Sequence, residues 1–133
     1  MNTTHFLNCV AGNLFGTKTS PAIPTEYYIG LSTTAPNVDG GNVSEPAVSA
    51  GYGRVLLDSL SAPENGVVTN TASVNFEEST ASWGTVTHFV IFDAETGGNL
   101  LMYGALSTPR VVEEATVMTI RQDYLRLSAQ NPA

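Results

Sequence analysis

The chain has 133 residues, with twelve acidic against five basic side chains and a net charge of −7; 42% of its residues are hydrophobic and 13% are charged. The apolar fraction excludes a disordered chain, and the few scattered Lys and Arg argue against a nucleic-acid partner, which needs clustered bases. The length fits one domain that buries its own core, and the single cysteine excludes an internal disulfide. The start lacks a basic region followed by an apolar run, and no window reaches a membrane span, so we expect cytoplasmic synthesis and no membrane partner.

Residues 4–15 (THFLNCVAGNLF) are predicted to form a short helix, because apolar residues recur at helical spacing. Thr3 or Thr4 can cap its start, and Gly16 can stop it. A helix this short is marginal alone, so we expect its apolar stripe to dock on the protein's own sheet or on a neighbouring subunit. The stripe consists of Phe6, Leu7, Val10, Ala11 and Leu14.

The middle of the chain alternates between extended and glycine- or proline-containing segments, which is typical of short strands and loops. In chain order the sequence predicts a proline-containing linker (17–24), a strand (25–34), a long loop (35–51), a strand (52–60), a turn (61–66) and one strand or two short ones (67–78). The loop is longer than a hairpin turn, which favours a surface role.

Residues 82–106 (SWGTVTHFVIFDAETGGNLLMYGAL) form the densest apolar stretch and predict a β-hairpin with arms 85–93 and 99–106. Gly97 and Gly98 occupy the bend, where positive backbone angles are needed. On the first arm Val86, His88, Val90 and Phe92 are expected on one face and Thr87, Phe89 and Ile91 on the other. Both faces are largely apolar, so the arm is predicted to be central and covered twice, by a second sheet and by either the N-terminal helix or a neighbouring chain.

After Pro109, residues 110–128 predict two more strands, around TVMTI and YLRLS, with a helix over 111–126 as the alternative. The expected fold class is therefore mainly β, an antiparallel β-sandwich or jelly-roll-like domain with a short N-terminal α-helix. We expect residues 1–24 to form a helix-and-linker arm and residues 25–133 to form a single β-sandwich domain.

The polar residues predict no catalytic, cofactor-binding or metal-binding site, and we expect the protein not to be an enzyme. A triad of Ser82, His88 and Asp93 is rejected, because side chains five apart on one strand point to opposite faces. Cys9 is interpreted as a buried structural thiol, although His5 lies one helical turn away and leaves a reactive cysteine open.

The apolar ribbon and helix instead predict packing, either against copies of the same chain, as a trimer, or against a scaffold. The residues assigned to this interface are Phe6, Leu7, Val10, Leu14, Phe89, Ile91, Leu101 and Tyr103. Trp83 is interpreted as a packing residue or as a stacking platform for a sugar, and Trp83 and Tyr52 are the side chains that could face a ligand.

Four blocks of the sequence resemble a family of small virion structural proteins of tailed bacteriophages, often labelled tail fibre or capsid decoration proteins. The blocks are LFG (14–16), YIGLSTTAP (28–36), EPAVSAGYGRV (45–55) and the ribbon 82–106; within the third, Gly53 stands where the family pattern has Ala. The match weakens after Pro109, and it brings no catalytic residue.

The resemblance implies a non-enzymatic protein of the virion, made in the cytoplasm of the host bacterium. Because the chain has no fibre shaft, we expect a capsid decoration (cement) protein that binds the head shell. The alternative is a tail fibre or baseplate component, or a module that binds a host receptor carbohydrate. The implied partners are other phage structural proteins, namely the major capsid protein or tail proteins, and further copies of the chain.

Overall fold

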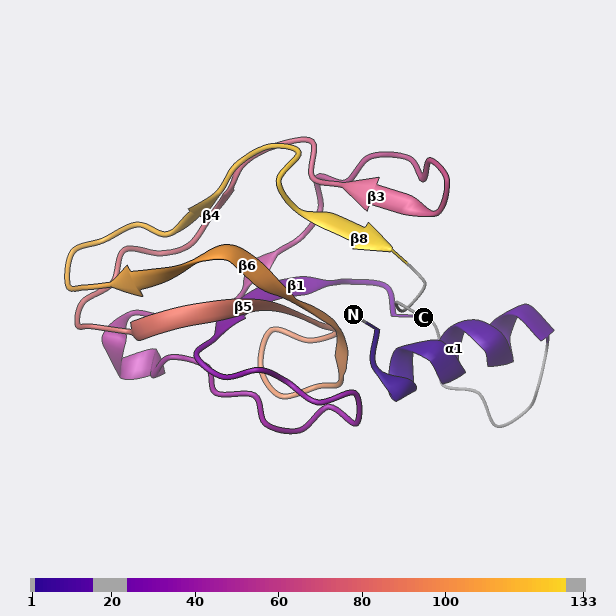
Figure 1. Cartoon of the computed structure of the whole chain (residues 1–133), viewed down its shortest axis with the longest axis horizontal. Helices are drawn as coiled ribbons and strands as arrows, with labels where there is room; N and C mark the ends of the chain where they lie inside the picture. The colour runs from indigo at the N-terminus through magenta and orange to yellow at the C-terminus, as the bar shows by residue number, and fades with distance from the viewer. Residues whose placement is uncertain (1, 16–23, 129–133) are drawn as a thin grey trace.

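The computed structural model describes residues 2–15 and 24–128 and contains mostly strands with one short helix (Figure 1). The helical elements are α1 (Thr4–Phe15) and a 3-10 turn, η1 (Val48–Ala50). The strands are β1 (Tyr28–Ser32), β2 (Val55–Leu56), β3 (Val67–Thr69), β4 (Val74–Asn75), β5 (Gly84–Phe92), β6 (Leu100–Val112), β7 (Thr119–Ile120) and β8 (Arg126–Ser128). Within the described ranges, no helix is both long and apolar enough to cross a membrane.

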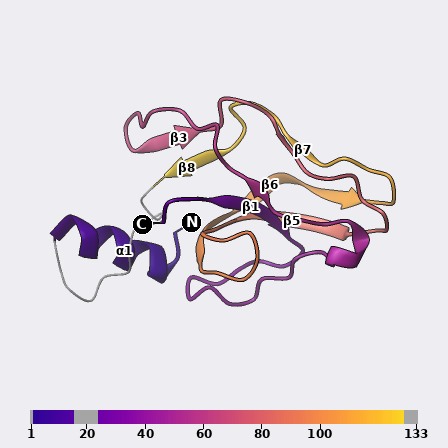
Figure 2. The same cartoon turned by 180° about the vertical axis from the view of Figure 1, so that it is seen from behind.

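The strands form two layers. One layer is a four-stranded antiparallel sheet in the order β2-β1-β5-β6, and the other consists of two antiparallel ribbons, β3-β8 and β4-β7. Figures 1 and 2 show both ribbons over the same side of the sheet. The main core lies between the layers, where Ile29, Leu31 and Ile91 of the sheet pack with Val74 and Ile120 of the ribbons. The predicted mainly β, antiparallel, sandwich-like fold with a short N-terminal helix is confirmed.

The helix has its predicted bounds, and its first turn is tied to the sheet. The Thr3 hydroxyl caps the helix by accepting from the Phe6 N–H at 3.2 Å, and it donates to the Leu100 carbonyl at 2.6 Å. The Thr3 N–H also donates to the Leu101 carbonyl at 2.9 Å. Cys9 is only 2% exposed, as predicted for a structural thiol. Gly16 and nearly all of the predicted linker 17–24 lie outside the described residues.

Strand β5 is central, as predicted, with β1 and β6 as its neighbours. A wide bulge interrupts its pairing with β6: Val86 pairs with Arg110 and His88 pairs with Ala105, so Thr87 alone lies opposite residues 106–109. The bulge changes the face on which Val86 lies. Val86 packs in the main core with Ile91, whereas Val90 and Phe92 belong to a second cluster. The predicted grouping of Val86 with Val90 and Phe92 is therefore wrong.

The second face of the sheet is covered by the chain's own loop. Val43 packs on a buried cluster of Val90, Phe92, Leu100 and Tyr103. In both Figure 1 and Figure 2 the loop between β1 and η1 lies on the side of the sheet opposite the ribbons. The covering of both faces was predicted. On this face it comes from the chain's own loop through Val43, and not from the helix that had been one of the expected sources.

The remaining elements are shorter than predicted or differently divided. The strand expected over 52–60 is reduced to β2, and 67–78 forms two short strands, one of the two interpretations left open. Strand β6 continues past Pro109 to Val112, and β7 and β8 follow. The alternative helix over 111–126 is therefore wrong.

Candidate functional site

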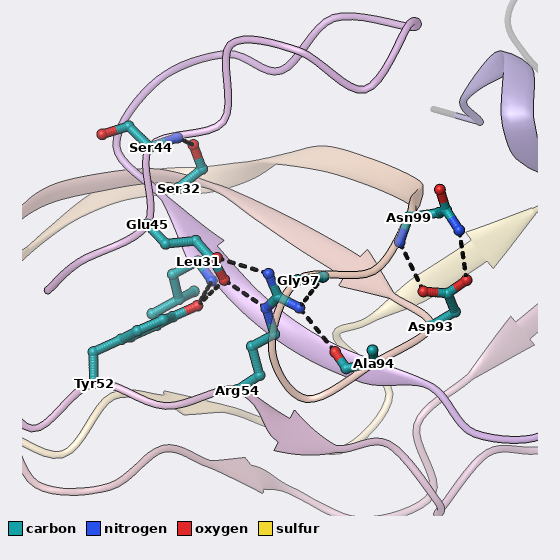
Figure 3. Close-up of polar contacts among 10 residues, drawn as sticks. All are labelled: Leu31, Ser32, Ser44, Glu45, Tyr52, Arg54, Asp93, Ala94, Gly97 and Asn99. Carbon is teal, nitrogen blue, oxygen red and sulfur yellow. Dashed lines mark hydrogen bonds and ion pairs between the residues drawn. The ribbon is translucent and has the colours of Figure 1, made fainter. Parts of the chain in front are cut away.

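The long loop and the hairpin bend are joined by one arginine, and we call this group the clamp: Glu45, Tyr52 and Arg54 with the bend at residues 94–97. Arg54 binds the Glu45 carboxylate with two hydrogen bonds, Nε–H to Oε1 and Nη2–H to Oε2, both of 2.9 Å (Figure 3). Its Nη1–H group donates to the carbonyl oxygens of Ala94 and Gly97, each at 2.8 Å. The two-pronged pair fixes both direction and distance.

The Arg54 side chain is only 7% exposed, and its guanidinium lies 3.6 Å from the centre of the Phe92 ring. This cation–π contact places the charge above the second cluster, which Val43 also covers. In the part of the chain that the structure describes, the Arg54–Glu45 contact is the only ion pair. The clamp thus holds the loop against the sheet through the Arg54 cation, whose charge is neutralised by Glu45.

Tyr52 extends the clamp into the core. Its hydroxyl donates to Glu45 Oε1 at 2.7 Å and accepts from the Leu31 N–H at 3.0 Å. Burial, followed by the hydrogen bond to Glu45, raises the pKa of Tyr52 well above its usual value. The neutral hydroxyl is therefore the form that the folded protein keeps.

Tyr52 and Trp83 pack against each other in a T-shaped arrangement with ring centres 5.4 Å apart. They are 6% and 5% exposed, and the Trp83 indole N–H donates to the Ala50 carbonyl at 2.9 Å. The interpretation of Trp83 as a packing residue is confirmed. The expectation that Tyr52 and Trp83 face a ligand is wrong, because distant carbonyl and carboxylate groups satisfy their polar tips inside the core.

The residues considered for a triad have separate partners. The Ser82 hydroxyl donates to the Val112 carbonyl at 3.3 Å, and His88 Nδ1 lies 2.8 Å from the Thr87 hydroxyl. Asp93 accepts from the backbone N–H of Asn99 at 2.7 Å and closes the hairpin bend (Figure 3). Desolvation lowers the pKa of His88. Among residues 2–15 and 24–128, no three His, Cys, Asp or Glu side chains gather as metal ligands would.

A second candidate feature is the outer side of α1, which stands beside the strands in Figure 1. Leu7, Val10, Leu14 and Phe15 are 38%, 39%, 73% and 76% exposed, and we call them the helix surface. The buried side of the helix is formed instead by Cys9 and Gly12. The helix sequence contains no Asp, Glu, Lys or Arg. A contiguous, uncharged apolar surface is typical of a protein–protein contact.

The structure divides the residues predicted to form an interface. Leu7, Val10 and Leu14 lie on the helix surface, so their interface role stays a prediction, and Phe6 and Phe89 are half-buried. Ile91, Leu101 and Tyr103 are 2%, 1% and 9% exposed within this single chain. Their apolar character is explained by the chain's own layers, and they present no free surface.

The sequence reasoning missed Glu45 and Arg54. A signal was present, because Arg54 directly precedes the apolar run Val55-Leu56-Leu57 in a predicted strand. A charged side chain in a strand needs an ion-pair or hydrogen-bond partner when that strand is buried under other parts of the chain. The identity of that partner, nine positions away in a loop, depends on the fold.

Comparison with known proteins gives one family. The model of a family described as "Podophage GP4 fiber I protein gp80" matches residues 3–128. The match extends over both layers of strands, the clamp and the helix surface, and it confirms the resemblance to phage virion structural proteins. No curated protein matches the chain.

Proposed function

Because the chain belongs to the family of podophage GP4 fiber I proteins, we propose that it is a non-enzymatic structural subunit of a phage fibre. In this proposal it packs against other virion proteins through the helix surface. The observation that carries this proposal is the family match over residues 3–128 together with the exposed apolar side of α1. The capping residue Thr3 hydrogen bonds to Leu100 and Leu101 of β6, so the start of the helix is attached to the sheet.

The rest of the molecule supports a role in cohesion. The clamp and the loop cover the second face of the sheet with contacts made inside this chain. The polar side chains Ser82, His88 and Asp93 hydrogen bond to separate partners, namely Val112, Thr87 and Asn99. The helix surface is open to a partner, because four large apolar side chains of this one element are exposed.

The finer prediction from the sequence, decoration of the capsid, stays a prediction. No described contact favours the head shell over a fibre, and the family description names a fibre. We therefore place the subunit in the fibre and treat decoration of the head as an outcome of the test.

The test uses phage particles that carry a small epitope tag on this protein. Gold-labelled antibody viewed by electron microscopy is expected to mark the fibres in few copies per particle. Labelling spread over the whole head, with hundreds of copies by quantitative mass spectrometry, would refute the fibre assignment in favour of decoration.

The role of the helix surface is tested in the same particles. A triple variant, Leu7→Glu, Val10→Glu and Leu14→Glu, is expected to be absent from purified particles although it folds. The matched control is Val48→Glu on η1, where the native side chain is 79% exposed; the η1 segment lies at the opposite end of the molecule from α1 (Figure 1). If the triple variant is incorporated as well as the control, another surface makes the contact.

A further inference from the structure

A second surface feature lies beside the bulge of β6. A cavity of about 380 Å³ opens between the bulged segment 105–110 and residues 118–125. This volume falls within the range of small-molecule sites, about 300–1,000 Å³. The bulge creates the opening, because residues 106–109 have no regular partner on β5.

The cavity has an apolar floor and a polar rim. Met118, Ile120 and Leu125 are 6%, 9% and 2% exposed and form the floor. The exposed residues Ser107, Thr108 and Arg110 also line the cavity and bring hydroxyl and guanidinium groups to this part of the surface. This combination suits a ligand that has an apolar face and a hydroxyl-bearing edge, which is the chemistry of a sugar ring.

Tyr124 adds an aromatic face to the rim. It is 71% exposed, in contrast to the buried Tyr52 and Trp83, and the Arg121 guanidinium lies 5.9 Å from its ring centre. An exposed aromatic ring next to hydroxyl groups provides a stacking surface for the C–H face of a sugar.

The charge at the cavity is opposite to that of the chain. The protein has twelve acidic side chains, yet none lies among the described residues that line this cavity. Arg110 and Arg121 form no ion pair with any described residue, whereas Arg54 is fully engaged by Glu45. An unpaired guanidinium in such a rim offers two parallel donors to a carboxylate.

We propose that the cavity between the β6 bulge and residues 118–125 binds a saccharide that carries a carboxylate, with Arg110 holding the carboxylate and Tyr124 stacking on the sugar ring. The site is separate from the helix surface, and it stands or falls independently of the proposed packing role.

The test is a titration of the isotope-labelled full chain with tri-galacturonate, followed by two-dimensional NMR. Saturable shifts are expected for residues 105–110 and 118–125. Three further probes are titrated in parallel: the methyl ester of the same trisaccharide, which is neutral, monomeric galacturonate and inorganic phosphate. We expect the acidic trisaccharide to bind at least tenfold more tightly than its ester and than phosphate.

Two variants and one control assign the contacts. Arg110→Gln is expected to weaken binding about tenfold, since it removes a charge-assisted pair, and Tyr124→Ala about fivefold. Arg126→Gln removes an exposed arginine that lines a different depression and is expected to change affinity less than twofold. The native residues are exposed, so the variants should fold, and a dispersed spectrum checks this.

The following outcomes of the titrations would overturn the proposal. Equal binding of the ester shows that the carboxylate is not recognised, and equal binding of phosphate shows an anion site without sugar recognition. Weakening by Arg126→Gln as large as that by Arg110→Gln shows binding by general charge alone. An absence of shifts at residues 105–110 and 118–125 removes the site.

Discussion

Arg54 joins a loop, a strand and a hairpin bend that are far apart in the sequence. Its guanidinium contacts Glu45, two carbonyl groups of the bend and the ring of Phe92. Removal of the guanidinium leaves the Glu45 carboxylate, which is 22% exposed, without its ion-pair partner. We expect Arg54→Ala to lower the free energy of unfolding by about 3 kcal/mol, measured by urea denaturation.

The matched control for this substitution is Arg126→Ala on β8, where the native arginine is exposed. Its effect on the free energy of unfolding is expected to stay within about 0.5 kcal/mol. If both alanine variants lose the same stability, the clamp does not hold the loop, and the second face of the sheet is covered by apolar packing alone.

Tyr52 gives the molecule a dependence on alkaline pH. The pKa of Tyr52 is raised in the folded state above the ordinary value of 10.0, mainly by burial. The folded state therefore keeps a proton that the unfolded state releases above pH 10. The contribution of this group to stability is fully present below that pH and declines progressively as the pH rises above it. Between pH 10 and pH 11 the native protein is expected to lose up to about 1.4 kcal/mol more than Tyr52→Phe.

The measurement compares urea denaturation of the two proteins at pH 9, 10 and 11. The other tyrosines are common to both, so the difference between the curves belongs to Tyr52. Parallel loss of stability in both proteins would show that the Tyr52 hydroxyl ionises in the fold as easily as in the unfolded chain.

At the scale of elements, the hairpin bend contains two glycines with positive φ but different surroundings. Gly97 has φ +62° and open space where a Cβ would lie. Gly98 has φ +74°, and a Cβ there would stand 2.8 Å from Ala94 Cβ and closer still to the Asp93 carboxylate that closes the bend. We expect Gly97→Ala to cost about 1 kcal/mol of stability, from backbone strain alone.

Gly98→Ala is expected to cost more than about 2 kcal/mol, because strain and displacement of Asp93 act together. Thermal unfolding of the two variants under identical conditions checks the order. Equal losses would mean that the bend shifts to admit the methyl group, and that the hydrogen bond from the Asn99 N–H to Asp93 adds nothing to the stability of the hairpin.

The elements that the sequence predicted well are those defined by local pattern. The stripe and the threonine cap predict α1, and the two apolar arms around Gly97 and Gly98 predict β5 and β6. The bulge was missed, although a signal existed. Pro109 stands inside β6, and proline inside a sheet is confined to edges and bulges.

The candidate site was harder to predict, because its contacts are not local. Trp83 donates to Ala50, and Arg54 donates to Ala94 and Gly97. A sequence pattern does not show which distant carbonyl group will accept a hydrogen bond from a buried side chain. The sequence alone therefore could not distinguish the buried Tyr52 and Trp83 from exposed aromatic residues such as Tyr124. The exposed rim of the cavity depends on the bulge and was invisible for the same reason.

At the scale of the whole molecule, charge limits where copies of the chain can meet. A net charge of −7 opposes close approach of two copies through their acidic surfaces. The helix surface contains no charged residue. Two copies that meet through it bury apolar side chains without bringing acidic groups together. We expect the purified protein to self-associate as its concentration rises. The mass of the associated species will show whether it is the trimer that the sequence predicts.

The variant that tests this contact is Leu14→Glu with Phe15→Glu, which places two charges on the most exposed part of the helix. Light scattering after size exclusion is expected to give the single-chain mass of 14.0 kDa for this variant, and a larger mass for the native protein and for Val48→Glu. The substituted side chains are 73% and 76% exposed, so the folded chain loses little packing and the change reports on association. A native protein that stays at 14.0 kDa at every concentration would exclude self-association and leave a different virion protein as the partner of the helix surface.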